Sequence, residues 1–342
     1  MQTRVIKVEE DNFREAMEEA TKLLAEGELV GIPTETVYGL AASAYSNDAV
    51  DKIFEAKGRP QDNPLIVHIS DMDMIDKVAV DIPEKAYELA EKFWPGPLTM
   101  ILKKHSNICD HVTCGQDTVA VRLPSHPVAK ELIRFSQIPL AAPSANLSGK
   151  PSTTTAQHVL DDHNGKIALI LDGGPCEFGV ESTIVSLIGE HPILLRPGVI
   201  SIDMIREICP DATVSDAVFH PLHEGEKVLS PGLKYKHYSP NADVILVDGE
   251  LDDFCRYVAE NAKGRTFAMC FDGEESTIPC EAVAYGKKGD GISQAKNVFS
   301  ILREMDELGA DTVFVRAPEE SGVSMAVDNR LLRAAGFRVI KV

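Results

Sequence analysis

The chain has 342 residues, of which 44% are hydrophobic, so it is long enough for two domains with sizeable cores. Its formal net charge of −19 disfavours broad nucleic-acid binding and requires any anionic ligand to be held by a local group of cations. No apolar run approaches the roughly 18–20 residues that cross a bilayer, and no signal peptide opens the chain, so we expect a cytoplasmic protein without a membrane partner. The seven cysteines contain no Cys-x-x-Cys pair, which favours reduced thiols over disulfides or a metal site.

Strand-like apolar runs alternate with amphipathic helical patterns along the first part of the chain. Strands are expected over residues 1–7, 29–32, 64–69, 98–102, 119–123, 167–171 and 182–187. Helices are expected over residues 11–25, 48–56, 83–93 and 127–135, with Asn47 as the N-cap of the second. This alternation predicts a mixed α/β domain over residues 1–210.

Residues 211–241 have no clear period and form a predicted linker, although residues 230–240 are unusually aromatic and basic for a passive tether. A second α/β series follows. Its strands are expected over residues 242–247, 266–271 and 312–315, and its helices over 252–262, 292–308 and a last segment through Leu331 and Ala334. Residues 242–342 therefore predict a smaller domain with a mostly parallel sheet.

Several common catalytic motifs are absent from the sequence. There is no Gly-x-x-x-x-Gly-Lys-Ser/Thr phosphate loop, no Gly-x-Gly-x-x-Gly, no His-Glu-x-x-His and no Gly-x-Ser-x-Gly. The usual nucleotide, hydride, zinc-peptidase and serine-hydrolase interpretations lose most of their support.

Cations at the ends of apolar runs are the main chemical signal. Lys57 and Arg59 flank a glycine in a segment stiffened by prolines, and such a pair of cations suits the binding of phosphate. Lys57 also has an ordinary explanation, because a cation near the C-terminus of a helix complements the helix dipole. Arg122 ends an apolar strand and needs an anionic partner, either an internal carboxylate or a substrate carboxylate. Arg196 ends another apolar run before Pro-Gly. Three arginines at such junctions in an acidic chain predict a ligand cavity.

Neutral polar residues surround these cations in the sequence. Ser144, Asn146 and Ser152 lie in a loop of small residues that lets backbone approach a ligand, or that only precedes a helix cap. Thr36 follows Glu35 in a segment that also fits an ordinary polar turn. His68 shares a strand face with Ile66, as an ordinary strand histidine would.

Six motifs occur together in a family-specific order. They are PTETVYGL (33–40), KGRP with NPL (57–65), WPGPLT (94–99), VRLP (121–124), PSAN with SG (143–149) and EST (181–183). The chain resembles the YrdC-like family of threonylcarbamoyl-AMP synthases over roughly residues 12–200. SPGLKYKHYSP (230–240) and the domain after it resemble the family's two-domain form.

The resemblance implies an α/β fold in which an open, twisted mixed sheet with helices lines a basic cavity, plus a smaller Rossmann-like α/β C-terminal domain. It implies a nucleotidyltransferase that makes L-threonylcarbamoyladenylate and pyrophosphate from L-threonine, bicarbonate or CO2, and ATP, for the N6-threonylcarbamoyladenosine modification of tRNA. Mg²⁺ would accompany ATP, with no organic cofactor and no metal bound by protein side chains. The product would pass to the tRNA threonylcarbamoyl transferase machinery, and direct tRNA contact stays open.

Family roles transfer to matching positions. Threonine-binding residues would be Thr36, His68, Arg122, the backbone at Ala142, and Ser182. ATP-binding residues would be Arg59, Asn63, Thr118, Ser144, Asn146, Ser152, Arg196 and His237, with Lys57 and Arg59 acting in catalysis. The linker with Tyr235, His237 and Tyr238 would serve as a lid. Ser186 departs from the family, where an acidic residue is expected, and this puts a supporting contact in doubt.

Three other functions compete with this interpretation. A double-stranded RNA or tRNA-binding module without adenylate-forming activity conflicts with the net charge and with the lack of interleaved aromatic residues. Carbamoyl transfer in hydrogenase maturation would call for zinc-type cysteine pairs, which the chain lacks. The second domain could also act as a structural adaptor.

Overall fold

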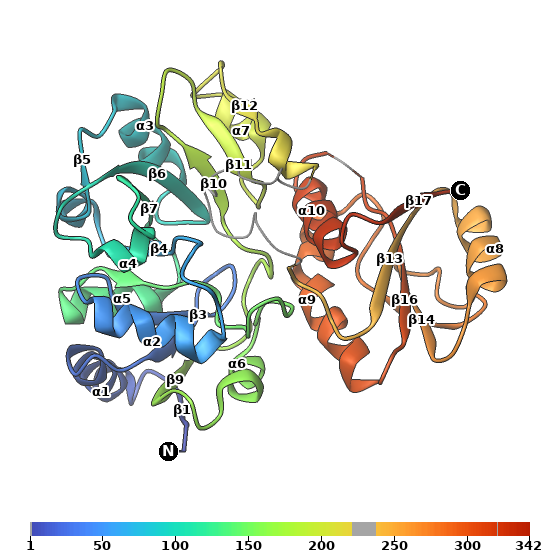
Figure 1. The fold of residues 1–342 in the computed structure, drawn as a ribbon, viewed down its shortest axis with the longest axis horizontal. Coiled ribbons are helices and arrows are strands. Elements are labelled where there is room, and N and C mark those ends of the chain that lie inside the picture. The colour runs from blue at the N-terminus through green and yellow to red at the C-terminus, as the bar shows by residue number, and fades with distance from the viewer. Residues whose placement is uncertain (1, 221–236, 320) are drawn as a thin grey trace.

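The computed structural model describes residues 2–220, 237–319 and 321–342, which contain two separate sheets joined through the segment after residue 220 (Figure 1). The first sheet has twelve strands, and β5 (Ala79–Val80) pairs with β6 outside its main path. In spatial order the main path is β1 (Arg4–Lys7), β9 (Leu169–Asp172), β2 (Val30–Ile32), β3 (Gly39–Ser43), β8 (Leu140–Ala141), β4 (Ile66–His68), β7 (Thr118–Arg122), β6 (Leu98–Lys104), β10 (Thr183–Ser186), β11 (Ile193–Arg196) and β12 (Thr213–Val214).

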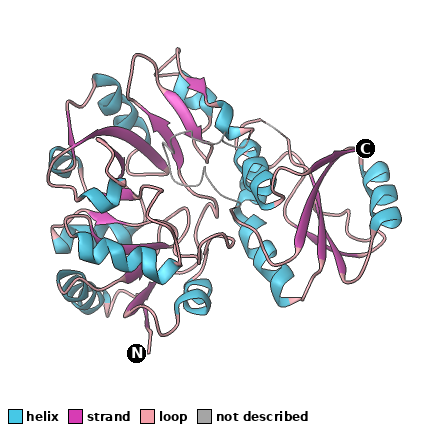
Figure 2. Ribbon diagram, viewed as in Figure 1, coloured by secondary structure: helices cyan, strands magenta, loops and turns pink. Residues whose placement is uncertain are grey.

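Helices cover this sheet and bury their apolar faces against it (Figure 2). They are α1 (Phe13–Ala25), α2 (Asn47–Lys57), α3 (Glu84–Phe93), α4 (Asp110–Thr113), α5 (Pro127–Ser136), α6 (Ala156–His163), α7 (Ile202–Arg206) and the 3-10 helices η1 (Met72–Lys77) and η2 (Asp216–Val218). The prediction that Asn47 caps α2 is wrong. Ser46 is the N-cap, because its side chain accepts from the backbone N–H of Ala49, whereas the Asn47 side chain accepts from the N–H of His111.

Strand pairing brings distant polar residues to one place. β4 and β7 run parallel, and their register pairs His68 with Arg122 at the last residue of each strand. Leu65, Val67 and Ile69 belong to the main core, as alternation along a strand requires, and Ile66 and His68 point to the opposite side. The ends of β4 and β7 that carry His68 and Arg122 therefore lie side by side.

The second sheet is parallel throughout, as expected for its alternating strands and helices. Its strands, in spatial order, are β15 (Glu281–Ala284), β14 (Thr266–Cys270), β16 (Thr312–Arg316), β13 (Asp243–Asp248) and β17 (Val339–Lys341). Its helix α8 (Leu251–Asn261) covers one face, while α9 (Gly291–Glu307) and α10 (Ser324–Ala334) cover the face toward the first sheet (Figure 1). The expected fold class, a twisted mixed sheet with helices plus a smaller parallel α/β domain, is confirmed.

The two parts of the chain pack closely through α9 and α10. Val37 and Val180 from the first part belong to the same apolar cluster as Phe299 of α9. Gly179 has a φ of +77°, and a Cβ at this position would lie 2.6 Å from the carbonyl oxygen of Ala295, so only glycine fits against the helix. Asn329 of α10 donates to the carbonyl of Val218 at 2.7 Å. The second part is thus in position to affect loops that belong to the first.

Two predictions from the sequence concern disulfide bonds and membrane-spanning helices. All seven cysteines are free thiols. Within the described ranges no helix combines the length and apolarity needed to cross a membrane.

Candidate functional site

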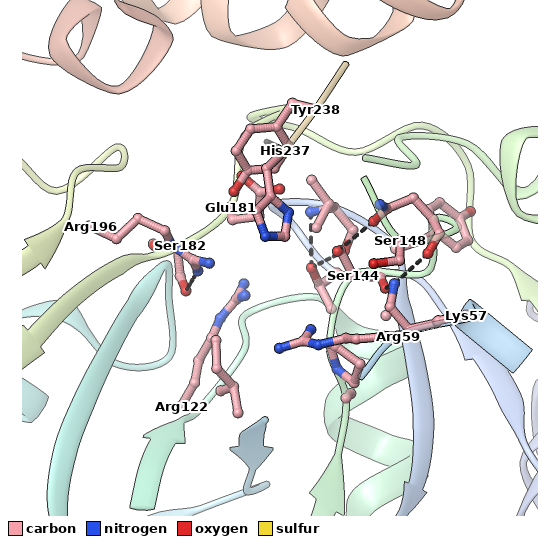
Figure 3. A pocket seen from close by; sticks show the side chains of 18 of the residues that line it. Lys57, Arg59, Arg122, Ser144, Ser148, Glu181, Ser182, Arg196, His237 and Tyr238 are labelled. Carbon is pink, nitrogen blue, oxygen red and sulfur yellow. Dashed lines mark hydrogen bonds between the residues drawn. The ribbon is translucent and has the colours of Figure 1, made fainter. Parts of the chain in front are cut away.

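One hollow lies at the C-terminal ends of β4, β7 and β11, where the loops after β2, α2, β8 and β9 also meet (Figure 3). It leaves about 690 Å³ free of protein atoms, open mouth included. Its lining residues are Thr34, Val37, Tyr38, Gly39, Lys57, Arg59, Ile66, His68, Arg122, Ala142, Pro143, Ser144, Asn146, Ser148, Gly149, Glu181, Ser182, Arg196, His237 and Tyr238.

Three arginines from separate elements face this hollow. Arg122 and Arg196 are the last residues of β7 and β11. Gly58 ends α2 in the left-handed conformation, with φ 61°, and the turn directs Arg59 toward the same space (Figure 3). An acidic chain therefore carries a local concentration of positive charge at one site.

Arg122 already has an internal anionic neighbour. Its Nη2 lies 2.7 Å from Glu35 Oε1, and the two side chains are only 4% and 2% exposed. The groups are close but poorly aligned, because Arg122 Nε and Nη2 and both Glu35 oxygens lack a hydrogen-bond partner within the described residues. Buried charges normally use their full hydrogen-bonding capacity. The pair therefore keeps donors and acceptors that a ligand or water can complete.

Arg196 and Ser182 form a second polar group in the wall. Arg196 Nε donates to the Ser182 carbonyl at 3.0 Å, and Nη2 donates to Ser182 Oγ at 3.2 Å. The same hydroxyl is 2.7 Å from Thr99 Oγ1 on β6. Burial lowers the pKa of Arg196 to about 10, so the group stays cationic at neutral pH. Ser182 is therefore fixed between a cation and a hydroxyl.

Lys57 supports the loop after β8. Its ammonium donates to the carbonyl of Ser144 at 2.6 Å and to the carbonyl of Asn146. Burial, together with the nearby Arg59 charge, lowers the pKa of Lys57 well below its usual value. Ser144 Oγ in turn donates to Asn146 Oδ1 at 2.6 Å. Lys57 therefore fixes the shape of a wall that offers neutral hydrogen-bonding groups.

Glu181 places a carboxylate in the lining of the hollow. It accepts from the Ser152 hydroxyl, and its Oε2 lies 2.7 Å from Arg330 Nε of α10. Burial alone would raise the pKa of Glu181, but the charges of Arg330 and Arg196 outweigh it and the pKa is lowered. An ionised carboxylate in a cationic site is thus held by a residue of the second sheet domain.

Two histidines in the hollow are held neutral. Burial lowers the pKa of His68 to about 3, with a further contribution from Arg122. Burial lowers the pKa of His237 to about 3 as well, assisted by Arg59. His68 Nδ1 and His237 Nε2 have no partner within the described residues. Each imidazole can therefore offer a neutral hydrogen bond to a ligand.

Ten of the residues with a role implied by the family resemblance line the hollow. They are Lys57, Arg59, His68, Arg122, Ala142, Ser144, Asn146, Ser182, Arg196 and His237.

Four others lie outside this lining. Thr36 Oγ1 is 2.9 Å from Thr34 Oγ1, and Ser152 bonds Glu181, so both contact lining residues directly. The Asn63 carbonyl accepts from Arg59 at 2.8 Å, while Thr118 begins β7 at the end opposite Arg122.

Other sequence expectations fall at the edge of the site or beyond the described residues. Tyr235 lies in the segment that the structure does not describe, whereas Tyr238 lines the hollow. Ser186 ends β10, where its Oγ accepts from the N–H of Ile188 at 3.3 Å, and it does not line the hollow.

Sequence reasoning assigned no role to Glu35, Glu181 or Arg330. The two carboxylates stand inside recognisable motifs, but a carboxylate beside a phosphate site has no obvious use until its cationic partner is known. Arg330 lies 149 residues from Glu181 along the chain, on a helix whose sequence shows only ordinary amphipathic spacing. Its lack of exposure, 0%, is visible only in the folded structure.

Comparison with known families accounts for both sheet domains. A family profile described as telomere recombination, named for Sua5, YciO and YrdC, matches residues 22–198, which is more than half of the chain. The chain belongs to the Sua5–YciO–YrdC family. A second profile, described as the threonylcarbamoyl-AMP synthase C-terminal domain, matches residues 200–336. The chain is therefore a two-domain member of the Sua5–YciO–YrdC family.

Similar members of the Sua5–YciO–YrdC family cover nearly the whole chain. A threonylcarbamoyl-AMP synthase of Pyrococcus abyssi (strain GE5 / Orsay) is 44% identical, with 97% of this chain and 98% of that protein covered. One of Bacillus subtilis (strain 168) is 43% identical, with 94% of each covered. The crystal structure of P. abyssi Sua5 complexed with L-threonine superposes with a TM-score of 0.93 at 42% identity, over 99% of this chain and 100% of that one.

Proposed function

We propose that this chain is a threonylcarbamoyl-AMP synthase, which joins L-threonine, bicarbonate or CO2, and ATP into L-threonylcarbamoyladenylate and releases pyrophosphate. The observation that carries the proposal is the convergence of Arg59, Arg122 and Arg196 on one hollow of an acidic chain. Full-length relatives with this name and a relative complexed with L-threonine support the choice of substrate. Because the reaction transfers an adenylyl group, the enzyme is a nucleotidyltransferase.

L-threonine is proposed to bind on the side of the hollow formed by β4 and β7. Arg122 has donors free for the carboxylate, and neutral His68 lies beside it in register. Ser182 and Thr36, together with the backbone at Ala142, are proposed to contact the remaining polar groups of L-threonine. A site built to bond a hydroxyl can reject analogues that lack it, because its own polar groups are then left unpaired.

ATP is proposed to occupy the part of the hollow nearer Arg59 and Arg196. The loop that Lys57 fixes offers Ser144 and Asn146 as neutral partners. The remaining proposed contacts come from Asn63, Thr118, Ser152 and His237. Arginine suits phosphate because its planar group donates two parallel hydrogen bonds.

The proposed reaction has two steps. The threonine amine attacks the carbon of bicarbonate or CO2, forming an N–C bond and a carbamate. Water leaves when bicarbonate is the reactant, and the amine releases a proton to solvent when CO2 is the reactant. A carbamate oxygen then attacks the α-phosphorus of ATP, and the bond to the β-phosphate oxygen breaks to release pyrophosphate. Arg59 and Arg196, with Lys57 holding the loop, are proposed to orient the triphosphate and stabilise the developing charge, so positioning and electrostatics would supply most of the catalysis.

Mg²⁺ is proposed to enter with ATP. Among residues 2–220, 237–319 and 321–342 no group of three or more His, Cys, Asp and Glu side chains could hold a metal ion. We therefore propose that water molecules and the phosphates of ATP supply most of the ligands of the ion, which is the usual mode for Mg²⁺. Bound there, the ion would neutralise phosphate oxygens.

Further proposals concern the cellular setting. The adenylate would be handed to the tRNA threonylcarbamoyl transferase machinery, consistent with a role in N6-threonylcarbamoyladenosine formation in the cytoplasm. His237 and Tyr238, which line the hollow, support a contribution of the predicted linker to closing the site over ATP.

Pyrophosphate release tests the proposal. The purified chain is incubated with ATP, Mg²⁺, L-threonine and bicarbonate, and the adenylate is identified by mass. We expect pyrophosphate only in the complete mixture, and none after omission of threonine or bicarbonate. Release that does not depend on threonine would contradict the proposed function.

A further inference from the structure

Two arginines of the second sheet domain contact segments that line or adjoin the hollow. Arg303 of α9 reaches the loop after β8, and Arg330 of α10 reaches the segment before β10. Both lie well over a hundred residues from their partners in sequence, so neither contact follows from local structure.

Arg330 is entirely buried and makes several contacts at once. Its Nε lies 2.7 Å from Glu181 Oε2, its Nη2 donates to the Glu181 carbonyl at 3.4 Å, and its Nη1 donates to Asn329 Oδ1 at 2.9 Å. The ring of Tyr238, which also lines the hollow, has its centroid 5.6 Å from the guanidinium carbon. Arg330 therefore fixes a carboxylate and packs on an aromatic ring of the site.

Ser152 connects the two arginines. Its hydroxyl donates to Glu181, which Arg330 holds, and its carbonyl accepts from Arg303 Nε at 3.3 Å. Arg303 also donates to the Pro151 carbonyl at 2.6 Å and pairs with Asp162 through both terminal nitrogens. The backbone next to the ATP-side wall is thus held from two directions by the second domain.

The charge of Glu181 makes its partner important. A carboxylate in the wall of a triphosphate site would repel the phosphates unless a cation neutralised it. Arg196 contributes to that neutralisation, but its hydrogen bonds go to Ser182, whereas Arg330 binds the Glu181 carboxylate directly. Removing one partner of a buried ion pair leaves an uncompensated charge.

We propose that Arg330 is a positioning residue for the ATP side of the site, which holds the Glu181 carboxylate against Ser152 and neutralises it. This inference rests on the proposed function, and it assigns the second domain a direct part in building the site. Arg330 acts through Glu181 and does not line the hollow itself.

The test compares Arg330→Met, Glu181→Gln and the double variant Arg330→Met/Glu181→Gln, using KM for ATP and for L-threonine from pyrophosphate release. Arg330→Met should raise KM for ATP about tenfold or more and change KM for threonine by less. The ratio of variant to wild-type KM for ATP should increase with pH, because Glu181 then ionises without its partner. In the double variant this pH dependence should disappear and the rise in KM should be smaller.

Arg316→Met is the matched control, because Arg316 is another buried arginine of the second domain, 3.1 Å from Glu274 and not among the residues lining the hollow. It should leave both KM values unchanged. A wild-type KM for ATP in Arg330→Met, or an increase that neither pH nor Glu181→Gln alters, overturns the proposal.

Two further outcomes are separable. If Arg330→Met does not fold, Arg330→Gln replaces it, since its polar but neutral side chain supplies no charge to Glu181, and a wild-type KM for ATP in that variant overturns the proposal. If the wild-type chain forms no adenylate, the proposed function fails, and equilibrium titration of ATP into the same variants still tests Arg330.

Discussion

The guanidinium of Arg122, which lines the hollow, lies 2.7 Å from the carboxylate of Glu35, and the two groups leave much of their hydrogen-bonding capacity unused. Both alternatives raised by the sequence for Arg122 therefore remain compatible, since it has an internal partner and still faces the hollow. A substrate carboxylate would meet an arginine whose charge is already compensated. Binding of the substrate carboxylate would then depend on the unused N–H donors of Arg122 more than on the net charge of the pair.

Replacing Glu35 with Gln tests this relationship. The variant should lose about 3–5 kcal/mol of unfolding free energy, because Arg122 is left buried without a counter-charge. L-threonine should restore more stability to this variant than it adds to the wild type, since its carboxylate supplies the missing anion. Urea unfolding with and without saturating L-threonine measures both effects.

Glu274→Gln is the control for that experiment, because Glu274 pairs with the buried Arg316 away from the hollow. It should reduce stability without any added benefit from threonine. Equal stabilisation of Glu35→Gln and wild type by threonine would count against a carboxylate site at Arg122.

A second prediction concerns Lys57. Lys57→Met should cost about 1–3 kcal/mol and weaken ATP binding about tenfold, because the carbonyls of Ser144 and Asn146 lose their donor and the loop loses its shape. Lys52→Met is the matched control on the same helix, since Lys52 donates to the Gly27 carbonyl at 2.8 Å but lies outside the lining of the hollow. Its ATP affinity should equal that of the wild type, as titration calorimetry can verify.

A third prediction uses pH. Burial lowers the pKa of His163 to about 4, with a further contribution from the nearby charge of Lys57. Between pH 6.5 and 4 the unfolded chain therefore binds a proton at this residue that the folded chain does not, so His163 destabilises the fold as pH falls. His163→Leu should remove this contribution. As pH falls from 6.5 to 4, the unfolding free energy of the variant minus that of the wild type should therefore rise by about 3 kcal/mol.

Chemical denaturation at several pH values measures this difference. His220→Gln, at an exposed position, should run parallel to wild type. A constant difference between His163→Leu and wild type from pH 6.5 to 4 would contradict a buried neutral imidazole.

The fold was predictable where side chains carry a strong pattern. The strand at β6 and the helices α1 and α9 have clear apolar periods, and the structure contains all three. The sequence does not predict the strand β3, because Gly39–Ser43 consists mainly of small residues with low strand propensity and is buried on both sides, so it shows no alternation. The sequence does not distinguish Ser46 from Asn47 as the N-cap of α2, because both residue types are good caps and only the backbone geometry separates them.

The site was predictable only in part, for a different reason. Motifs mark the residues that face the hollow, because small residues and strand-end cations leave a local signature. Counter-charges carry no such signature: Glu35 lies 87 residues from Arg122, and Arg330 belongs to another domain. Long-range ion pairs depend on how sheets and helices pack, and a single sequence does not encode them in any local spacing.

Titration of ATP and of L-threonine into the wild type, Arg59→Ala and the neutral-pair variant Arg122→Met/Glu35→Gln tests the central claim most directly. The double variant removes the Arg122 cation without leaving Glu35 charged and unpaired. We expect Arg59→Ala to weaken ATP binding at least tenfold with little effect on threonine, and the double variant to do the reverse. Exchanged effects, or wild-type affinities for both ligands in both variants, would contradict a single cationic hollow that holds an amino acid beside a triphosphate.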